Sequence, residues 1–364
     1  MAAVATAAAL AGGGVAWGQI TPTWRDVPFA TVPVAGGQTT TLRMNIYRPA
    51  GATGRTPLVV WIHGGGWQSG SYSTPINALM SPLLQRGVSV ATVGYRLSGQ
   101  AIFPAQIHDV KGAVRFLRAN AAAYMIDPAR VACAGSSAGG HLAALLAASG
   151  GVEGLEGSTG GNGGLSSSVL ACVDYFGPSD IVQMNPDVTT PPGSSVNHDA
   201  PTSPESRLIG FNQPGQGIGV LRANLNNPAP PFPEKAALAR DASPISFVGP
   251  DEVLFFIAHG DADTVVPLRQ STRLRDALLA AGNGPVYRVS PGAGHGALGA
   301  TVDAEARDFL VVALTACLAD LNRDNETTFD DVLAFVRMYN AANHRADFTL
   351  DAELTFDDIA AFIA

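Results

Sequence analysis

VACAGSSAGGHLAALLAA, residues 131–148, is the stretch that decides the fold. Its apolar start, Val131–Ala134, is typical of a short buried strand, and Gly139–Ala148 is typical of an apolar helix. Between them, Gly135-Ser136-Ser137-Ala138-Gly139 has small residues on both sides of a serine, as a sharp strand-to-helix turn requires. Such a turn raises the central hydroxyl above the sheet, facing the positive end of the helix. Ser137 is therefore the candidate nucleophile, and a glycine-rich turn of no chemical role is the alternative.

From residue 40 onward, short apolar runs alternate with segments of helical period. We expect strands over 58–62, 89–95, 131–134, 169–175, 253–258 and 286–289, and helices over 75–86, 104–123, 139–148, 268–281 and 302–318. Strands separated by helices pair in parallel, because each helix returns the chain to the same edge of the sheet. The sequence thus predicts an α/β protein with a mostly parallel sheet and helices on both faces.

The alternation lapses over about 185–235, which is rich in Pro, Asn, Gly and Ser. Only a short piece around 206–209 has a helical period there. Because a long structureless loop is uncommon inside a compact domain, we expect an insertion that folds over the ends of the strands.

A second glycine-rich turn, His63-Gly64-Gly65-Gly66-Trp67, follows the apolar run 58–62. Successive glycines let backbone amides approach a developing oxyanion without interference from a Cβ. We assign the oxyanion hole to the amides of Gly65, Gly66 and Ala138. No Lys-Ser or Lys-Thr follows the glycines, which excludes a phosphate-binding loop. Trp67 lines the substrate pocket or packs in the interior; the sequence leaves both open.

Seven histidines are candidates for the base. In folds with this kind of nucleophile turn the chain order is Ser, acid, His, each on a loop after a strand. His295, in Gly292-Ala293-Gly294-His295-Gly296, satisfies both conditions. His259 opens the acid loop and is expected to brace that turn, while His63 and His141 are expected to be structural.

The segment 259–267, HGDADTVVP, offers two carboxylates two residues apart. We favour Asp263 as the acid that orients the imidazole, because hydrolases with G-x-x-D-x-x-V-P use the last Asp of that unit. Asp261 is expected to cap the turn.

Several motifs together resemble one family. HGGGW (63–67), YRLSG (95–99), the 29 residues from FPAQIH to DPARV (103–131), GSSAGGHLAALL (135–146), DYFGPSD (174–180), HDAPTSPESRLIG (198–210), HGDADTVVP and GAGHG (292–296) are similar to α/β-hydrolase esterases of the bifunctional feruloyl and acetylxylan esterase group, near the hormone-sensitive-lipase-like enzymes.

The resemblance covers 32–318, within an expected catalytic domain at 22–318. It implies an α/β-hydrolase fold and hydrolysis of carboxylic esters by a Ser137–His295–Asp263 triad without a cofactor. The implied substrate is a small ester or an acylated polysaccharide, such as an acetyl or feruloyl ester of plant or algal polysaccharide. The stretch 213–233 is longer than usual for the group.

Charge is unevenly distributed. The 364 residues include 22 basic and 30 acidic side chains, a formal charge of −8, and 320–364 holds ten acids and three bases, which leaves −1 for the first 319 residues. Net acidity with few lysines excludes a nucleic-acid or anionic-membrane surface. The asymmetry predicts a domain boundary near 319.

The tail repeats with a 27-residue period, and each copy has the acidic spacing of an EF-hand-like calcium loop. The first loop offers Ca²⁺ the side chains of Asp320, Asn322, Asp324 and Asp331 and the carbonyl of Glu326. The tail (319–364) resembles a dockerin of the kind that starts with Cys and ends Gly-Cys, a small all-α module. That resemblance implies a cohesin-like or cell-surface partner. Cys317 fits the start, and the closing Cys is absent. Two amphipathic helices with solvated acidic caps are the alternative.

Residues 1–18 are uncharged and rich in Ala, Gly and Val, as in a secretory signal that is removed. A basic n-region is missing, so we expect the start to lie upstream. The stretch is too weakly apolar for a membrane anchor, and no later segment is long and apolar enough to span a bilayer. A secreted, cell-surface or periplasmic bacterial protein is therefore expected.

Cys133 and Cys172 lie in predicted strands, where two inert thiols or one bridge are the alternatives.

Two functions compete with the esterase. One is a serine peptidase on the same fold, although that class usually adds a propeller domain for which about 40 residues before the first core strand leave no room. The other is a non-catalytic anchored binding protein, which the complete set of triad residues disfavours.

Overall fold

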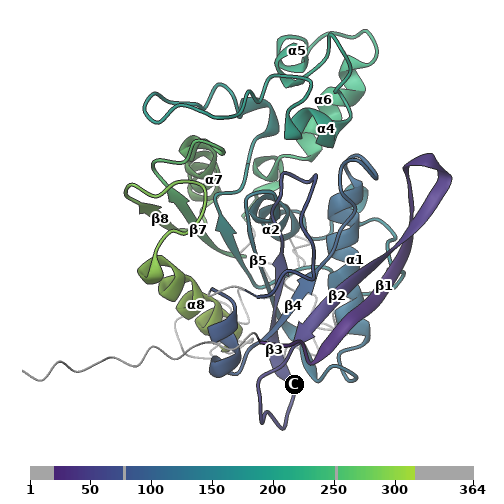
Figure 1. Cartoon of the computed structure of the whole chain (residues 1–364), viewed down its shortest axis with the longest axis vertical. Coiled ribbons are helices and arrows are strands. Elements are labelled where there is room, and N and C mark those ends of the chain that lie inside the picture. Colours follow the sequence, from purple (N-terminus) through teal and green to yellow (C-terminus); the bar gives the residue numbers. More distant parts are fainter. Residues whose placement is uncertain (1–19, 77–78, 251–252, 316–364) are drawn as a thin grey trace, which may run out of the picture.

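A mixed sheet organises the part of the chain that the computed structural model describes, residues 20–76, 79–250 and 253–315 (Figure 1). Its eight strands stand in the order β1-β2-β4-β3-β5-β6-β7-β8. Their bounds are β1 Trp24–Val34, β2 Gln38–Tyr47, β3 Thr56–Ile62, β4 Ser89–Val93, β5 Ile126–Ser136, β6 Ala171–Tyr175, β7 Leu254–Gly260 and β8 Val286–Ser290.

Six neighbouring strands pair in parallel, as predicted; in sheet order they are β4, β3, β5, β6, β7 and β8. Four of the seven β3 residues are fully buried, because helices cover both faces of the sheet. Cys133 of β5 and Cys172 of β6 lie opposite one another, and both are buried free thiols, so the alternative of a bridge is not realised in this structure.

Two antiparallel strands, β1 and β2, extend the sheet beyond β4. The apolar-run criterion did not predict this hairpin. Strand β1 and the first half of β2 mix exposed polar with buried residues, whereas the last four residues of β2 are all buried. Strand β1 contains Pro28 and Pro33, which suit an edge strand.

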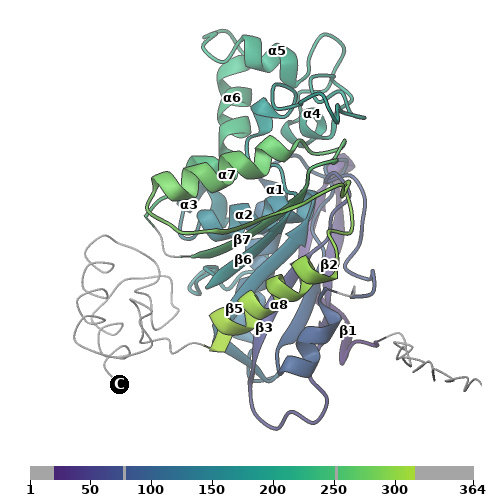
Figure 2. The ribbon, with the colours of Figure 1, turned by 90° about the vertical axis from the view of Figure 1, so that its left-hand side faces the viewer.

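Helices lie in two layers, which Figure 2 shows on either side of the sheet. One face is covered by α1 (Ala105–Ala119), α2 (Ala138–Ala148) and α7 (Leu268–Ala280), with the short α3 (Glu153–Glu156) beside α1. The other face is covered by α8 (Ala300–Thr315) and the 3-10 turn η2 (Ser81–Arg86). Of the predicted helix over 75–86, the described residues contain only the 3-10 turn η2, and Pro82 disfavours a regular α-helix through this point.

The insertion folds as a small cap, which Figure 1 shows above the sheet. It contains α4 (Pro204–Ile209), α5 (Ile218–Ala223) and α6 (Phe232–Asp241), flanked by the 3-10 turns η3 (Ile181–Gln183) and η4 (Pro244–Phe247). The cap meets the body through backbone hydrogen bonds, from Phe103 N–H to the Leu208 carbonyl (2.9 Å) and from Ser195 N–H to the Thr264 carbonyl (2.7 Å). These short helices stand where the sequence indicated mostly loop.

The two terminal modules lie outside the described residues. These are the predicted signal, 1–18, and the dockerin-like tail, 319–364, with Cys317 and the calcium-ligand candidates Asp320, Asn322, Asp324, Glu326 and Asp331. Within the described part, no helix is long and apolar enough to cross a bilayer. The same residues contain no group of three or more His, Cys, Asp or Glu side chains arranged to hold a metal ion.

Candidate active site

The turn between β5 and α2 holds Ser137 in a conformation that few residues adopt, with φ 55° and ψ −125°. Only glycine fits at positions 135 and 139 of this turn, because neighbouring backbone atoms leave no space for a side chain. A methyl group on Gly135 would lie 2.2 Å from the Gly139 carbonyl oxygen, and one on Gly139 would lie 2.1 Å from the Ile62 carbonyl oxygen. The Ser137 amide donates to the Tyr175 carbonyl of β6 at 2.8 Å. Close packing against two neighbouring strands therefore fixes this turn.

The three predicted triad side chains meet at the carboxyl ends of the strands. His295 Nε2 lies 2.9 Å from Ser137 Oγ, and His295 Nδ1 lies 2.7 Å from Asp263 Oδ2. An ionised Asp263 can only accept, so Nδ1 carries the hydrogen and Nε2 is free to accept from the serine hydroxyl. This is the geometry of an activated serine nucleophile.

Asp263 is buried and heavily hydrogen-bonded. Its Oδ1 accepts from the amides of Val265 (2.7 Å) and Val266 (3.0 Å). Burial on its own raises the pKa of Asp263, but hydrogen bonds from His259, His295 and the Val265 amide outweigh it, so the pKa lies well below its usual value. The carboxylate stays ionised and can stabilise an imidazolium at His295.

The loop that carries His295 is fastened to the acid loop. The Asp261 carboxylate accepts from the Gly292 amide at 2.6 Å, and the Ala262 amide donates to the Ala293 carbonyl at 3.0 Å. A methyl group on Gly260 would lie 2.1 Å from that same carbonyl oxygen. Asp261 therefore joins two loops, beyond the turn-capping role expected for it.

Phe176 is a site residue that the sequence did not single out. Its ring centroid lies 4.6 Å from that of His295, and its backbone has φ 44°, unusual for an aromatic residue. It occurs in the DYFGPSD motif, directly after β6. The ring of Phe176 therefore packs against the imidazole of His295.

The oxyanion loop lies directly against the nucleophile turn. A methyl group on Gly64 would lie 2.8 Å from the Ser136 carbonyl oxygen, and Gly65 and Gly66 both have positive φ. Within the described residues, the amides of Gly65, Gly66 and Ala138 donate to no protein acceptor. Unengaged donors beside a nucleophile are what an oxyanion hole requires.

Trp67 does not line a pocket. Its side chain is only 1% exposed, and its indole N–H donates to His141 Nδ1 at 3.1 Å. His141 in turn bonds the Ala242 carbonyl through Nε2 at 2.6 Å, and burial lowers its pKa to about 4, so the ring is neutral. The prediction of Trp67 as a substrate-pocket residue is therefore wrong for this structure, and the packing alternative holds. Trp67 fixes the oxyanion loop onto α2 from the interior.

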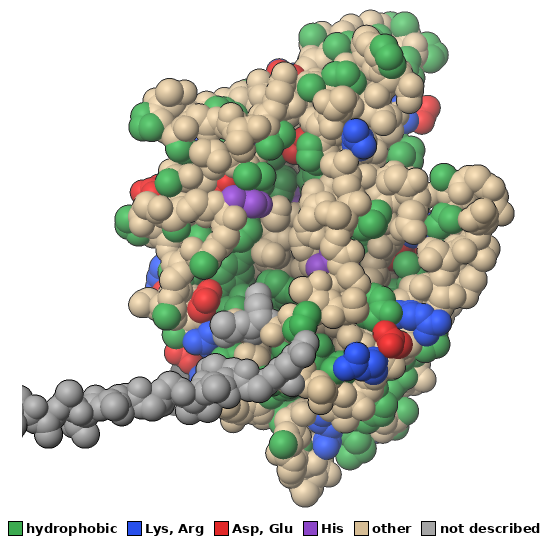
Figure 3. Space-filling model, in the orientation of Figure 1, with side chains coloured by type: hydrophobic (Ala, Val, Ile, Leu, Met, Phe, Trp, Pro, Cys, Tyr) green, Lys and Arg blue, Asp and Glu red, His purple; other side chains and the backbone are tan. Residues whose placement is uncertain are grey.

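The cap reaches the oxyanion loop. Pro204, the first residue of α4, lies 3.5 Å from where a Cβ of Gly66 would stand. Figure 3 shows a hollowed face below the cap, with histidine side chains at its surface among mostly neutral and hydrophobic groups. The cap therefore forms one side of the entrance to the site.

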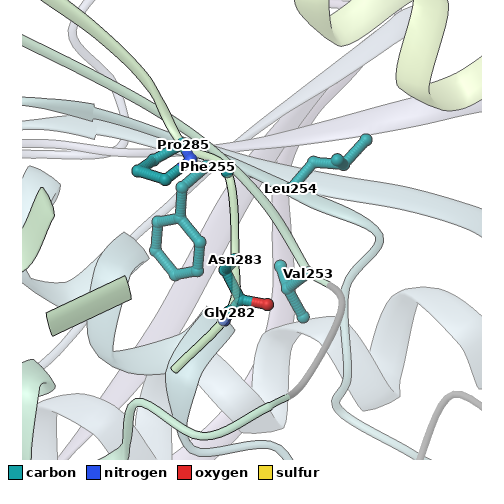
Figure 4. Close-up of a pocket in the computed structure, with 7 residues that line it drawn as sticks. Val253, Leu254, Phe255, Gly282, Asn283 and Pro285 are labelled. Atoms are coloured by element: carbon teal, nitrogen blue, oxygen red, sulfur yellow. The ribbon is translucent and has the colours of Figure 1, made fainter. Parts of the chain in front are cut away.

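A separate small crevice lies far from this chemistry. Figure 4 shows it between Val253–Phe255 and Gly282–Pro285, with a volume of about 150 Å³. These residues stand at the amino-terminal ends of β7 and β8, whereas the triad lies at the carboxyl ends. The crevice is not part of the site.

Fold and site together define an α/β-hydrolase with a Ser–His–Asp arrangement. The chain belongs to the BD-FAE family, whose model matches residues 44–278.

Comparison with known proteins agrees with this placement. The chain is 31% identical over 251 residues to Esterase LipQ of Mycobacterium tuberculosis, a match that covers 68% of this chain and 52% of LipQ. A solved structure described as a truncated form of carbohydrate esterase from gut microbiota is 30% identical and superposes with a TM-score of 0.68 over 82% of this chain and 99% of that one. The bifunctional GH43-CE protein of Bacteroides eggerthii is 31% identical, with a TM-score of 0.66, over 80% of this chain and 35% of that one. The chain spans about half the length of the curated relatives it matches.

Proposed function

We propose that the protein is a secreted serine esterase that hydrolyses carboxylic esters through an acyl-enzyme on Ser137. The observation that supports this most strongly is the unbroken hydrogen-bond chain from Ser137 Oγ through His295 to Asp263. The unengaged amides of Gly65, Gly66 and Ala138 beside it complete the set of groups that acyl transfer needs.

In the proposed reaction, Ser137 Oγ attacks the ester carbonyl carbon while His295 Nε2 takes the hydroxyl proton. The carbonyl oxygen becomes an oxyanion, which accepts hydrogen bonds from the amides of Gly65, Gly66 and Ala138. When the carbon–oxygen bond to the alcohol breaks, His295 returns the proton to the leaving alkoxide. A water molecule, deprotonated by His295, then releases the acid from the acyl-enzyme. Asp263 stabilises the imidazolium in both halves, and no cofactor takes part in this scheme.

The proposed substrate is a neutral acylated carbohydrate, such as an acetyl or feruloyl ester of plant or algal polysaccharide. Support comes from two similar solved structures whose descriptions name carbohydrate esterases. The first 319 residues carry a net charge of only −1, which suits an uncharged substrate.

A substrate panel on the purified protein tests this function. We expect turnover of p-nitrophenyl acetate, acetylated xylan or feruloylated arabinoxylan by wild type and none by Ser137→Ala, with Ser136→Ala as the matched control that keeps activity. Cleavage of aminoacyl amides without ester turnover would instead identify a serine peptidase. An intact protein that cleaves neither would support the non-catalytic binding function.

For the tail we propose structural Ca²⁺ at Asp320, Asn322, Asp324, Glu326 and Asp331, and docking to a cohesin-like or cell-surface partner. Support comes from the acidic repeat of the sequence alone. Calorimetric titration of the full chain with Ca²⁺ should give binding heat that Asp320→Ala with Asp324→Ala abolishes. Absence of heat in wild type contradicts the metal proposal.

A further inference from the structure

A second histidine contacts the candidate catalytic acid, at the same carboxylate oxygen as His295. His259 is the penultimate residue of β7, and its side chain is fully buried. Its Nε2 lies 3.2 Å from Asp263 Oδ2 and 2.9 Å from the Val266 carbonyl oxygen. Its Nδ1 lies 2.7 Å from the hydroxyl of Ser271, itself buried in α7.

The partners of the His259 ring assign its hydrogens. Nε2 faces a carbonyl and a carboxylate, neither of which can donate, so Nε2 carries a hydrogen and shares it between them. In the neutral ring Nδ1 then accepts from the Ser271 hydroxyl, which satisfies both nitrogens in a site that solvent does not reach. The carbonyl and the carboxylate therefore select the tautomer that points an N–H at Asp263, and the Ser271 hydroxyl satisfies the other nitrogen.

With this bond, each oxygen of Asp263 has two donors. Oδ1 accepts from the amides of Val265 and Val266, and Oδ2 accepts from His295 and His259. Without His259, the reacting imidazole of His295 is the single partner of Oδ2 among the described residues. The carboxylate could then follow the imidazole as it moves, and the orientation of the base would be less well defined.

We propose that His259 is a positioning residue that holds Oδ2 of Asp263 in place, so that the carboxylate fixes the plane and tautomer of His295. This inference rests on the proposed esterase function. It assigns to His259 a role in the rate of acyl transfer, whereas a brace of the turn would affect folding alone. The hydrogen bond from His259 is also one of the causes that keep the pKa of Asp263 low.

Two substitutions of similar shape distinguish the contributions of the two ring nitrogens of His259. The amide nitrogen of Gln reaches the place of Nε2 and keeps a donor for Asp263, whereas the amide of Asn reaches only the place of Nδ1. We expect His259→Asn to lower kcat by about 10- to 100-fold, which corresponds to the free energy of one hydrogen bond to a charged group. KM should change by less than about threefold. His259→Gln should restore most of kcat.

A double-mutant cycle distinguishes positioning from a general structural effect. In an Asp263→Asn background, the loss caused by His259→Asn should largely disappear, because the residue acts through that carboxylate. His108→Asn, on α1 outside the site, is the control and should leave kcat unchanged. If His259→Asn fails to fold cooperatively, Ser271→Ala takes its place, with an expected loss in kcat of about 3- to 10-fold.

Three results overturn the inference: unchanged kcat in His259→Asn or its substitute Ser271→Ala, an equal loss in the Asp263→Asn background, or no advantage of Gln over Asn. Failure of the proposed function is distinguishable. In that case wild type itself lacks ester hydrolysis, or Ser137→Ala retains it.

Discussion

The nucleophile turn (135–141) and the acid loop (259–267) each position one member of the triad, but different interactions stabilise the two segments. Backbone packing fixes the nucleophile turn, since Gly135 and Gly139 leave no space for a methyl group. In the acid loop one glycine, Gly260, is packed as tightly, and hydrogen bonds add to the packing, since Asp263 accepts from Val265, Val266, His259 and His295. A single substitution at a glycine of the nucleophile turn should therefore abolish most of the activity. Loss of one hydrogen bond in the acid loop should lower activity and stability only in part.

The largest effect is expected from the nucleophile itself. Ser137→Ala removes the attacking oxygen and should lower kcat by about 10⁴- to 10⁶-fold, measured with p-nitrophenyl acetate. Ser136→Ala, one residue earlier, should remain within about threefold of wild type. Loss of activity in Ser136→Ala with retention in Ser137→Ala would reverse the assignment of the nucleophile.

A buried carboxyl beneath the nucleophile turn should make stability depend on pH. Asp174 of β6 is fully buried, its Oδ1 accepts from the Gly177 amide at 2.8 Å, and its Oδ2 has no partner among the described residues. Burial raises the pKa of Asp174 to about 7 from 3.8, so the folded state holds the proton more tightly than the unfolded state. The associated stability is present below pH 3.8 and is lost as pH rises to about 7, a change of about 4 kcal/mol.

Asp174→Asn cannot titrate and should lack this dependence. Urea unfolding of both proteins at several pH values measures it, and the difference between them removes the contribution of other groups. The variant should gain stability relative to wild type as pH rises from about 4 to 8. A constant difference over that range would show that Asp174 is ionised throughout in the folded protein.

The packing of the nucleophile turn can be tested with one methyl group. Gly135→Ala places a methyl 2.2 Å from the Gly139 carbonyl oxygen and should cost about 3 kcal/mol of stability together with most of the activity. Gly163→Ala is the control, because nothing lies within 4 Å of that position. Thermal unfolding and kcat are the measurements, and a Gly135→Ala protein with normal values would contradict the packing argument.

The smallest effect is expected in the acid loop. Asp261→Ala removes an exposed hydrogen bond of 2.6 Å to the Gly292 amide and leaves Asp263 in place. We expect a loss of about 1 kcal/mol in stability and a decrease in kcat of a few fold. Asp276→Ala, an exposed acid paired with its neighbour Arg275, should change neither. A decrease as large as that of Ser137→Ala would mean that the acid was assigned to the wrong aspartate.

The same contrast explains what the sequence predicts and what it does not. The nucleophile turn constrains residue size at fixed spacing, so a single stretch revealed the strand, the turn and the helix. Strands buried on both faces leave apolar runs, and this predicted the parallel strands β3 to β7. The edge strand β8 is partly exposed, and its short run 286–289 predicted it as well. In the hairpin β1–β2, strand β1 and the first half of β2 mix exposed and buried residues, and β1 contains two prolines, so the hairpin escaped that criterion.

Side-chain contacts between distant segments were not predictable. Trp67 follows three glycines of the oxyanion loop, and nothing in the sequence shows that its ring turns inward to His141. The contact of Phe176 with His295 depends on a positive φ at a non-glycine residue, which carries no sequence signal. A local contact also carried no signal: His259 and Asp263 are four residues apart, and only the turn after β7 brings Nε2 of His259 to Oδ2 of Asp263.

Covalent labelling tests the central claim most directly. A p-nitrophenyl alkylphosphonate presents a tetrahedral phosphorus to the nucleophile and leaves a stable adduct. Intact-mass analysis and peptide mapping should find one phosphonyl group per chain, on Ser137, with esterase activity lost in proportion to labelling. Complete labelling of Ser137 with activity retained, or inactivation with the adduct on another residue, would contradict the account.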